Sequence, residues 1–171
     1  MKIKVKLFDG QSIPEINNNG DWIDLRANKE IKLSSPFSNT LNGKRDKRNV
    51  EFSNELIPLG IAMELPKGFE AVLLPRSSTY KHFAICLANH QGVIDNKFCG
   101  DNDQWFFNAI AFNDTTIKKG DRICQFRIQL SQFATIWQKI KWLFWNGKIE
   151  FIKVDNLCNT NRGGHGTTGI N

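Results

Sequence analysis

The sequence predicts an all-β sandwich or barrel with one helical insertion, on three observations. From Glu55 to Phe133, short apolar runs recur between turn signals such as PKGFE and KKGD, which is typical of the strands of a sandwich or barrel. Phenylalanine is common, with 13 residues, and aromatic side chains fit a pleated, half-buried surface. Residues 133–146, FATIWQKIKWLFWN, break this pattern because their apolar residues recur at helical spacing.

The order of the elements follows from local patterns along a chain of 171 residues, the length of one domain. Near the N-terminus, IKVKLF alternates polar and apolar residues and predicts a half-buried strand. Residues 9–20 are rich in Gly, Asn and Pro and predict a loop before the short segment DWIDLRA. The basic stretch NGKRDKRN at 42–49 lacks apolar periodicity, so it predicts a solvated loop, with a binding patch as the alternative.

The helical spacing within residues 133–146 predicts an amphipathic helix of about three turns that ends at Asn146-Gly147. The helix could pack on the sheet or on a neighbouring subunit, and a place on a membrane surface is the weaker alternative. After it, KIEFIKVD returns to the alternation of a strand, and the glycine-rich segment NRGGHGTTGIN follows.

Composition restricts the class of protein without choosing a function. The formal net charge of +6 favours contact with polyanions such as phosphates, nucleic acid or anionic lipid. No signal peptide and no run of about 18 apolar residues occurs, so a membrane protein is not expected. The four cysteines form no CxxC pair or zinc-like spacing and predict reduced thiols in a cytoplasmic protein: Cys86, Cys99, Cys124 and Cys158.

Four polar segments suggest a phosphate-binding site, although each alone has an ordinary structural explanation. The glycine-rich C-terminal segment would let backbone N–H groups approach a phosphate chain while Arg162 neutralises its charge. PRSSTYK places Arg76 and two serine hydroxyls directly after a strand, where an exposed turn is equally reasonable. Asp95 stands in a turn of NHQGVIDNKFCGD, close to the aromatic Phe98, and a lone Asp in a turn is usually a turn former. Gln125 follows a hydrophobic pair in KKGDRICQF.

Taken together, in this order and at these spacings, five segments resemble the five signature motifs of the dUTP pyrophosphatase (dUTPase) family. The resemblance extends from Asp21 to Gly169, which is most of the chain. The third segment is the most specific, because Gly-Val-Ile-Asp followed by an aromatic residue and then a glycine is not a common accident. The five segments are NGDWIDLRA, PRSSTYK, ANHQGVIDNKFCGD, KKGDRICQ and RGGHGTTG.

The resemblance implies a fold and an assembly. The expected fold is a distorted jelly-roll or β-clip barrel of the dUTPase type over residues 1–158, with the helical insert at about 134–146. Residues 159–171 would form a flexible, glycine-rich C-terminal arm that closes over the active site. The family forms homotrimers whose sites lie between subunits, so a homotrimer with shared sites is expected.

The resemblance also implies hydrolysis of dUTP to dUMP and pyrophosphate. Asp95 would activate the water that attacks the α-phosphorus. Phe98, which stands where the family usually has Tyr, would pack under the deoxyribose and exclude a 2′-hydroxyl. Asn89 would recognise the uracil edge in a hairpin too tight for the thymine methyl, with Gly92 and Ile94 beside it.

The remaining site residues would hold the triphosphate and its magnesium. Mg²⁺ would be chelated mainly by the three phosphates, with Asp24 holding waters around it, as suits a hard cation that keeps its waters. His165 stands where the family commonly has Phe stacked on the uracil. The residues expected to contact the phosphates or to form the closing segment are Arg76, Ser77, Ser78, Gln125, Arg162, Gly164, Gly166, Thr167 and Thr168.

Three other functions compete with this one. A dCTP deaminase, or a bifunctional enzyme, shares the fold but needs a Glu on the strand after the third motif, and QWFFNAIAF contains none. A phage regulatory protein of the same fold would bind a repressor, with the basic stretch 42–49 or the Trp-rich insert as its docking surface. A direct nucleic-acid binder is not expected, because no RNP-like or helix-turn-helix pattern occurs. The helical insert and the segment GDNDQWFF depart from the commonest family pattern and are similar to features of phage members.

Overall fold

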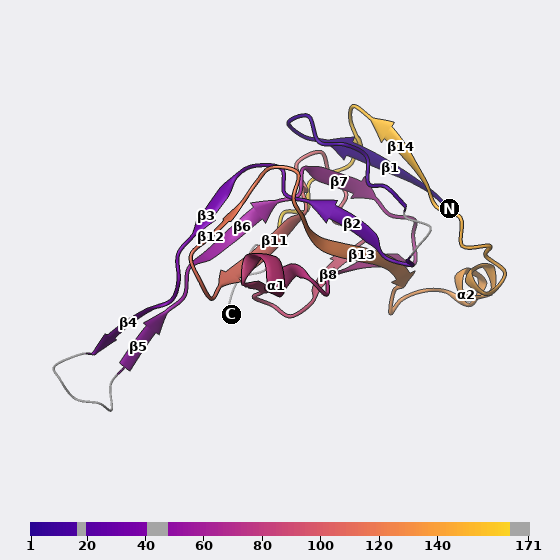
Figure 1. Cartoon of the computed structure of the whole chain (residues 1–171). Coiled ribbons are helices and arrows are strands. Elements are labelled where there is room, and N and C mark those ends of the chain that lie inside the picture. The colour runs from indigo at the N-terminus through magenta and orange to yellow at the C-terminus, as the bar shows by residue number, and fades with distance from the viewer. Residues whose placement is uncertain (17–19, 41–47, 165–171) are drawn as a thin grey trace.

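The computed structural model describes residues 1–16, 20–40 and 48–164, which fold mainly into β-strands around one apolar core (Figure 1). This architecture confirms the prediction of an all-β fold with a helical insertion. Two predicted turns are also confirmed, because Gly68 of PKGFE and Gly120 of KKGD both adopt positive φ angles, +85° and +93°.

A four-stranded antiparallel sheet carries most of the residues discussed below. Its strands are β2 (Ile23–Arg26), β8 (Phe69–Pro75), β10 (Gly92–Asp95) and β13 (Arg122–Leu130). Their order across the sheet is β10-β8-β13-β2. Strand β8 pairs with β13 along its whole length, from Phe69 opposite Leu130 to Pro75 opposite Cys124. Asp95 lies opposite Glu70 near the start of β8, and Arg76 directly follows its end, so β8 runs between two groups of polar residues.

The other strands form two three-stranded sheets and two strand pairs. They are β1 (Lys2–Leu7), β3 (Ile31–Leu33), β4 (Phe37–Thr40), β5 (Arg48–Glu51), β6 (Asn54–Pro58), β7 (Ile61–Glu64), β9 (Ile85–Leu87), β11 (Phe106–Ala111), β12 (Thr115–Ile117) and β14 (Glu150–Val154). The sheet orders are β14-β1-β7 and β6-β11-β9, and the pairs are β12–β3 and β4–β5. Strand β1 is antiparallel to β7 but parallel to β14, so the predicted first and last strands lie side by side.

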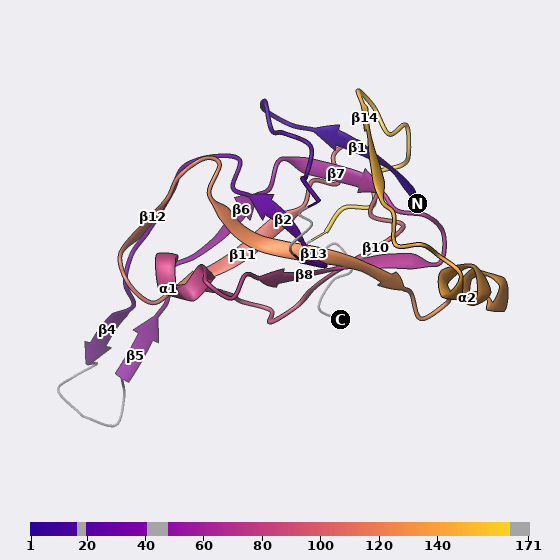
Figure 2. The same ribbon diagram turned by 45° about the vertical axis from the view of Figure 1, so that its right-hand side comes forward.

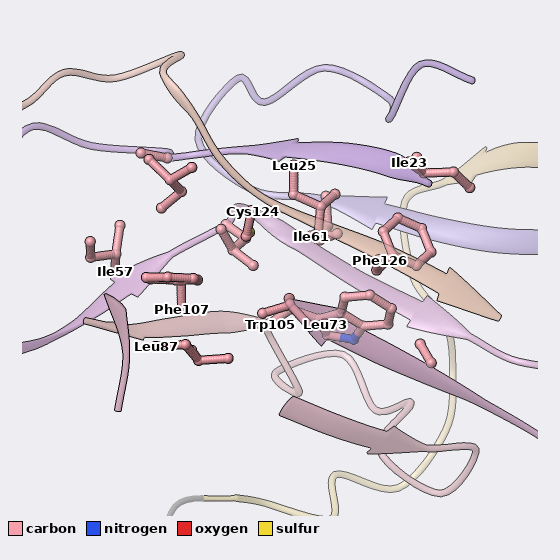
Figure 3. Packing of buried hydrophobic residues seen from close by; sticks show 14 of the residues in the cluster. Ile23, Leu25, Ile57, Ile61, Leu73, Leu87, Trp105, Phe107, Cys124 and Phe126 are labelled. Atoms are coloured by element: carbon pink, nitrogen blue, oxygen red, sulfur yellow. The ribbon is translucent and has the colours of Figure 1, made fainter. Parts of the chain in front are cut away.

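Alternation along the strands builds the core. In β11, Phe107, Ala109 and Ala111 are buried, and the residues between them are only half-buried. At the start of the same segment, Trp105 packs edge to face against Phe126 of β13, with ring centroids 5.2 Å apart (Figure 3). Both rings are almost completely buried, so they join two sheets.

The strands β4 and β5 form a hairpin that projects from the body of the molecule (Figures 1 and 2). The predicted solvated loop at 42–49 is wrong at its C-terminal end, because Arg48 and Asn49 belong to β5, where pairing with β4 outweighs the lack of apolar periodicity. Residues 41–47 lie outside the described residues.

The predicted helix forms as α2 (Ile136–Leu143). Thr135 begins it with a capping box, in which Gln138 N donates to Thr135 Oγ1 at 3.3 Å and Gln138 Oε1 accepts from Thr135 N at 2.7 Å. The predicted end at Asn146-Gly147 is wrong, because the helix ends at Leu143 and the Trp145 indole stacks on Trp142, with ring centroids 4.8 Å apart.

The sheet holds α2 at only a few points. Gln138 Nε2 donates to the Lys67 carbonyl at 2.8 Å, and the Trp142 ring packs against Phe69 with centroids 5.4 Å apart. Much of the apolar face remains exposed, including Trp137 at 71% and Leu143 at 76%. Packing on the sheet is thus confirmed for Trp142 and is wrong for most of the helix. No helix among the described residues is long and apolar enough to cross a membrane.

Candidate active site

Asp95 is fixed at the end of the edge strand β10, opposite Glu70 of β8. The backbone N–H of Lys97 donates to Asp95 Oδ1 at 2.8 Å, and that of Phe98 donates to the Asp95 carbonyl at 3.1 Å. These bonds form the predicted turn and orient the carboxylate. The second carboxylate oxygen, Oδ2, pairs with Arg162 Nη1 at 2.6 Å. The turn therefore presents a half-buried carboxylate whose one oxygen is held by the backbone and whose other oxygen meets a cation.

A pocket of about 200 Å³ lies beside this turn. Six residues that the sequence predicts to bind substrate line it: Asn89, Gly92, Ile94, Phe98, Arg162 and Gly164. The pocket contains amide groups, a guanidinium and an aromatic ring, so it can hydrogen-bond a polar base edge and stack on a flat or puckered ring.

The segment around Asn89 differs from the prediction. Asn89 stands in a turn between β9 and β10, in which His90 adopts a positive φ of 57°. The expected hairpin is wrong, because β9 pairs with β11 and β10 pairs with β8. The turn links two sheets, and the exposed Asn89 side chain lies at the pocket between them.

A second polar cluster lies at the other end of β8. The Asp24 carboxylate of β2 pairs with Arg76 Nε at 2.8 Å and with Arg122 Nη1 at 3.2 Å. Gln125 Nε2 reaches the Pro75 carbonyl at 3.4 Å. The structure thus brings together Asp24, Arg76 and Gln125 from three of the predicted motifs, and it adds Arg122, which the motif pattern did not single out.

The segment PRSSTYK is only partly the predicted loop. Ser77 and Ser78 form a turn, and the short helix α1 (Thr79–Phe83) follows directly. The buried Thr79 fixes this turn, because its hydroxyl donates to the Ile123 carbonyl at 2.7 Å and accepts from Arg76 N at 3.0 Å. Ser77 is exposed next to Arg76, and Ser78 is half-buried at the start of α1.

The two clusters do not meet within the described residues of one chain. Asp95 lies opposite Glu70 near the start of β8, whereas Arg76 follows the end of that strand. Glu70 and Arg76 are six residue steps apart, a distance of about 20 Å at the usual rise of a strand. Within one chain, strand β8 thus holds the Asp95 carboxylate and the Asp24–Arg76 cluster well apart.

Sequence reasoning missed the segment that positions Arg162. The buried carboxylate of Asp103 accepts hydrogen bonds from the backbone N–H groups of Gly100, Arg162 and Gly163. Asp103 lies in GDNDQWFF, the segment that departs from the commonest family pattern, and this departure was the only signal in the sequence. The contacts themselves join residues about 60 positions apart, so no local pattern reveals them. His165, Gly166, Thr167 and Thr168 lie outside the described residues.

Two of the cysteine thiols have raised pKa values. Burial raises the pKa of the Cys99 thiol, and the carboxylates of Glu64, Asp103 and Asp95 raise it further. Burial also raises the pKa of Cys124 well above its ordinary value, so both thiols stay protonated and are poor nucleophiles. All four cysteines are free, as predicted. In the described part of the chain, no group of three or more His, Cys, Asp or Glu side chains could hold a metal ion.

The fold and the pocket define an all-β protein of the jelly-roll class with a polar pocket beside a carboxylate–guanidinium pair. A family model for dUTPase matches residues 45–137. The chain is also 47% identical to the SPbeta prophage-derived deoxyuridine 5'-triphosphate nucleotidohydrolase YosS of Bacillus subtilis, over 171 residues and 99% of each chain. The chain belongs to the dUTPase family.

Solved structures agree with this fold. A dUTPase from Streptococcus mutans superimposes with a TM-score of 0.61 at 17% identity, over 77% of this chain and 98% of that chain. The dUTPase of Staphylococcus aureus phage phi11, whose structure is described with a coordinated structural Mg(II) ion, superimposes with a TM-score of 0.58 at 15% identity, over 78% of this chain and 94% of that chain. The jelly-roll fold of dUTPases is therefore shared despite low identity.

Proposed function

We propose that this chain hydrolyses dUTP to dUMP and pyrophosphate. The observation that carries the proposal is the Asp95 carboxylate, fixed beside a pocket that Asn89 and Phe98 line and joined to Arg162 Nη1 at 2.6 Å. A carboxylate that accepts a proton, a pocket for a nucleoside and a cation for phosphate are the three groups that this hydrolysis needs.

In the proposed reaction, Asp95 orients a water molecule and takes its proton as the oxygen attacks the α-phosphorus. The new bond joins the water oxygen to that phosphorus. The bond from the α-phosphorus to the oxygen that bridges it to the β-phosphorus breaks in line, and pyrophosphate leaves with the bonding electrons. The turn that fixes Asp95 Oδ1 through Lys97 N supplies orientation, which is a large part of the rate gain in such reactions.

Arg162 has two possible anionic partners in this scheme. In the structure its guanidinium pairs with Asp95 Oδ2 and so occupies one of the two carboxylate oxygens. Substrate phosphates compete for the same guanidinium, since arginine binds phosphate oxygens in the same forked geometry. We infer that binding of the triphosphate moves Arg162 onto the phosphates and leaves Asp95 Oδ2 available to the water.

Magnesium fits this chain as an ion held chiefly by the substrate. The described residues form no cage of acidic ligands, and the Asp24 carboxylate is already paired with Arg76 and Arg122. Mg²⁺ commonly uses one or two carboxylates together with phosphates and retains its waters. Bound in that way, with Asp24 reached through water, it would neutralise charge on the phosphates.

The same proposal includes a homotrimer with shared sites, a cytoplasmic location and a division into a body at 1–158 and an arm at 159–171. The separation of about 20 Å between the Asp95 turn and the Asp24–Arg76 cluster supports sharing, because strand β8 holds them apart. A different copy of the chain would then supply Arg76, Ser77 and Gln125 to the phosphates of a nucleotide bound beside Asp95.

Mixing two inactive variants tests the sharing of sites. Asp95→Asn and Arg76→Ala each remove one half-site, so we expect each variant alone to be nearly inactive. After the two are refolded together in equal amounts, about a quarter of the sites should combine an intact Asp95 with an intact Arg76 from another copy. The measurement is dUTP turnover of the mixture. If the mixture stays as inactive as its two components, each site lies within one chain.

Removal of the Phe98 ring tests the choice of sugar. We expect Phe98→Ala to reduce the preference for dUTP over UTP, measured as the ratio of kcat/KM values, by about 10- to 100-fold, the range by which a pocket wall discriminates against one added group. Phe98→Tyr is the matched control, because it keeps the ring and should keep the preference. An unchanged ratio in Phe98→Ala would show that another residue excludes the 2′-hydroxyl.

The reaction itself is tested by incubating the protein with dUTP, dCTP, dTTP and UTP in the presence of Mg²⁺ and measuring pyrophosphate and ammonia. Pyrophosphate from dUTP alone is the expected result. Release of ammonia from dCTP would replace the proposal by the deaminase, whose required Glu is missing from β11. No product from any of the four nucleotides would leave a regulatory, repressor-binding protein of this fold as the better explanation.

A further inference from the structure

Residues 99–103 form a seat for residues 157–163, which include the first five residues of the proposed arm at 159–171. Leu157 N donates to Asp101 Oδ1 at 2.8 Å, and Asn159 Nδ2 donates to the Cys99 carbonyl at 3.4 Å. One step further along, Asn102 N donates to Asn161 Oδ1 at 2.8 Å. The two segments are thus joined at every second residue of the C-terminal one. None of these contacts belongs to the pocket or to the Asp24–Arg76 cluster.

Asp103 ends this seat with three backbone hydrogen bonds. Its Oδ2 accepts from Gly100 N at 2.8 Å and from Arg162 N at 2.9 Å, and its Oδ1 accepts from Gly163 N at 3.0 Å. The side chain is only 2% exposed. These three hydrogen bonds are strong, because a charged acceptor forms stronger hydrogen bonds than a neutral one.

The charge state of Asp103 supports this arrangement. Burial by itself raises the pKa of Asp103, but the N–H groups of Arg162, Gly100 and Gly163 and the positive charge of Arg162 together lower it below the ordinary value. The carboxylate is therefore charged at neutral pH. Because the pKa is lower in the folded chain, the group stabilises the folded state above its unfolded pKa of about 3.9. This contribution is lost as the pH falls through the folded value.

Gly100 makes the close approach possible. A Cβ at this buried position would meet Asn161, with its backbone nitrogen only 2.7 Å away and other atoms closer still. Glycine is thus the residue that lets the two backbones lie together. A larger residue at position 100 would therefore prevent residues 157–163 from packing on the seat in this way.

We propose that Asp103 is a positioning residue, which holds the backbone of Arg162 so that the guanidinium reaches both Asp95 and the substrate phosphates. This inference rests on the proposed hydrolysis of dUTP. With its backbone fixed by Asp103, Arg162 passes from Asp95 Oδ2 to a phosphate by side-chain rotation alone. We call the three hydrogen bonds of Asp103 to Gly100, Arg162 and Gly163 the clamp. Because the clamp already orders the Arg162 backbone, substrate binding loses less conformational entropy, which is the benefit of preorganisation.

Amide exchange tests the clamp without any substrate. In the full-length chain, we expect the Arg162 and Gly163 amides to be protected, and we expect Asp103→Asn to speed their exchange by about tenfold or more. Asn has a single acceptor oxygen in place of two, so at least one of the three N–H groups loses its partner. Asp114→Asn is the matched control, because Asp114 likewise accepts from a backbone N–H, that of Ser35 at 2.7 Å, far from the seat.

Two outcomes of this measurement would overturn the clamp. The first is unprotected exchange of both amides in the wild-type chain, which requires no variant to fold. The second is unchanged exchange in Asp103→Asn and also in Gly100→Ala, which should push Asn161 away by steric overlap.

Kinetics with dUTP then separate positioning from a general structural role. We expect Asp103→Asn to lower kcat/KM by about 10- to 100-fold and Arg162→Ala to lower it further. The double variant should be no worse than Arg162→Ala alone, because a residue that acts through Arg162 has nothing left to position. Effects that multiply would overturn the positioning role. If the wild-type chain does not hydrolyse dUTP, the proposed function fails, whereas the exchange result still decides whether the clamp exists.

Discussion

Asp95→Asn is expected to lower kcat for dUTP by about 10²- to 10⁴-fold, the usual contribution of a positioned general base. Asparagine has the same shape, and its amide oxygen can still accept the hydrogen bond from Lys97 N that orients the turn. It cannot take a proton from water, and it loses the ion pair with Arg162. Nucleotide binding should therefore persist while the chemical step fails.

The measurement pairs steady-state turnover with calorimetric titration of dUTP, so that kcat and binding are read separately. Asp114→Asn serves again as the control, since it exchanges a carboxylate that also binds a backbone N–H, and it should keep full turnover. Turnover of Asp95→Asn within about threefold of wild type would exclude Asp95 as the base.

Trp105→Ala is expected to reduce the free energy of unfolding by about 3–5 kcal/mol, the range found when large aromatic residues are removed from cores. The Trp105 side chain is 1% exposed, and its ring meets Phe126 at an interplanar angle of 86°. Its backbone also joins neighbouring strands, since Trp105 N donates to the Ile61 carbonyl and Leu59 N donates to the Trp105 carbonyl. Domains are stable by only about 5–15 kcal/mol, so this loss is a substantial fraction of the total stability.

Urea denaturation followed by fluorescence or circular dichroism measures this loss. Trp105→Phe is the matched control. Among the described residues the buried indole Nε1 has no hydrogen-bond partner, so exchange for Phe removes volume but breaks no hydrogen bond. It should cost clearly less than Trp105→Ala. Equal losses in the two variants would contradict the expectation that the cost is set by the volume removed from the core.

The sequence was informative wherever structure depends on neighbouring residues. Alternation predicted β1 and β14, a short apolar run between turn signals predicted β11, and glycines predicted the turns at Gly68 and Gly120. The motif around Asp95 and Phe98 predicted residues that do lie around one pocket, because they sit on a single turn and the strand before it. Such features are set by periods of a few residues and by backbone preferences.

The main feature that the sequence did not predict depends on distant partners. Nothing near Asp103 indicates that it binds Arg162 and Gly163, because the contact is made only after the sheets assemble. The end of α2 at Leu143 is a local difference: Trp145 stacks on Trp142 although the helix has already ended, and apolar spacing alone does not show this. The hairpin around Asn89 was an expectation from the family resemblance, and it is wrong because β9 and β10 pair with different strands.

The parallel pairing of β1 with β14 has a consequence for synthesis on the ribosome. Lys2 pairs with Glu150, so one edge of β1 must wait for the end of the chain, roughly 10 to 30 seconds at usual translation rates. An unpaired edge strand is a template for aggregation, and lysines are a common protection against it. Strand β1, KIKVKL, carries a lysine at every second position. These three charges would keep the nascent chain from pairing with its neighbours on a polysome until its own last strand emerges.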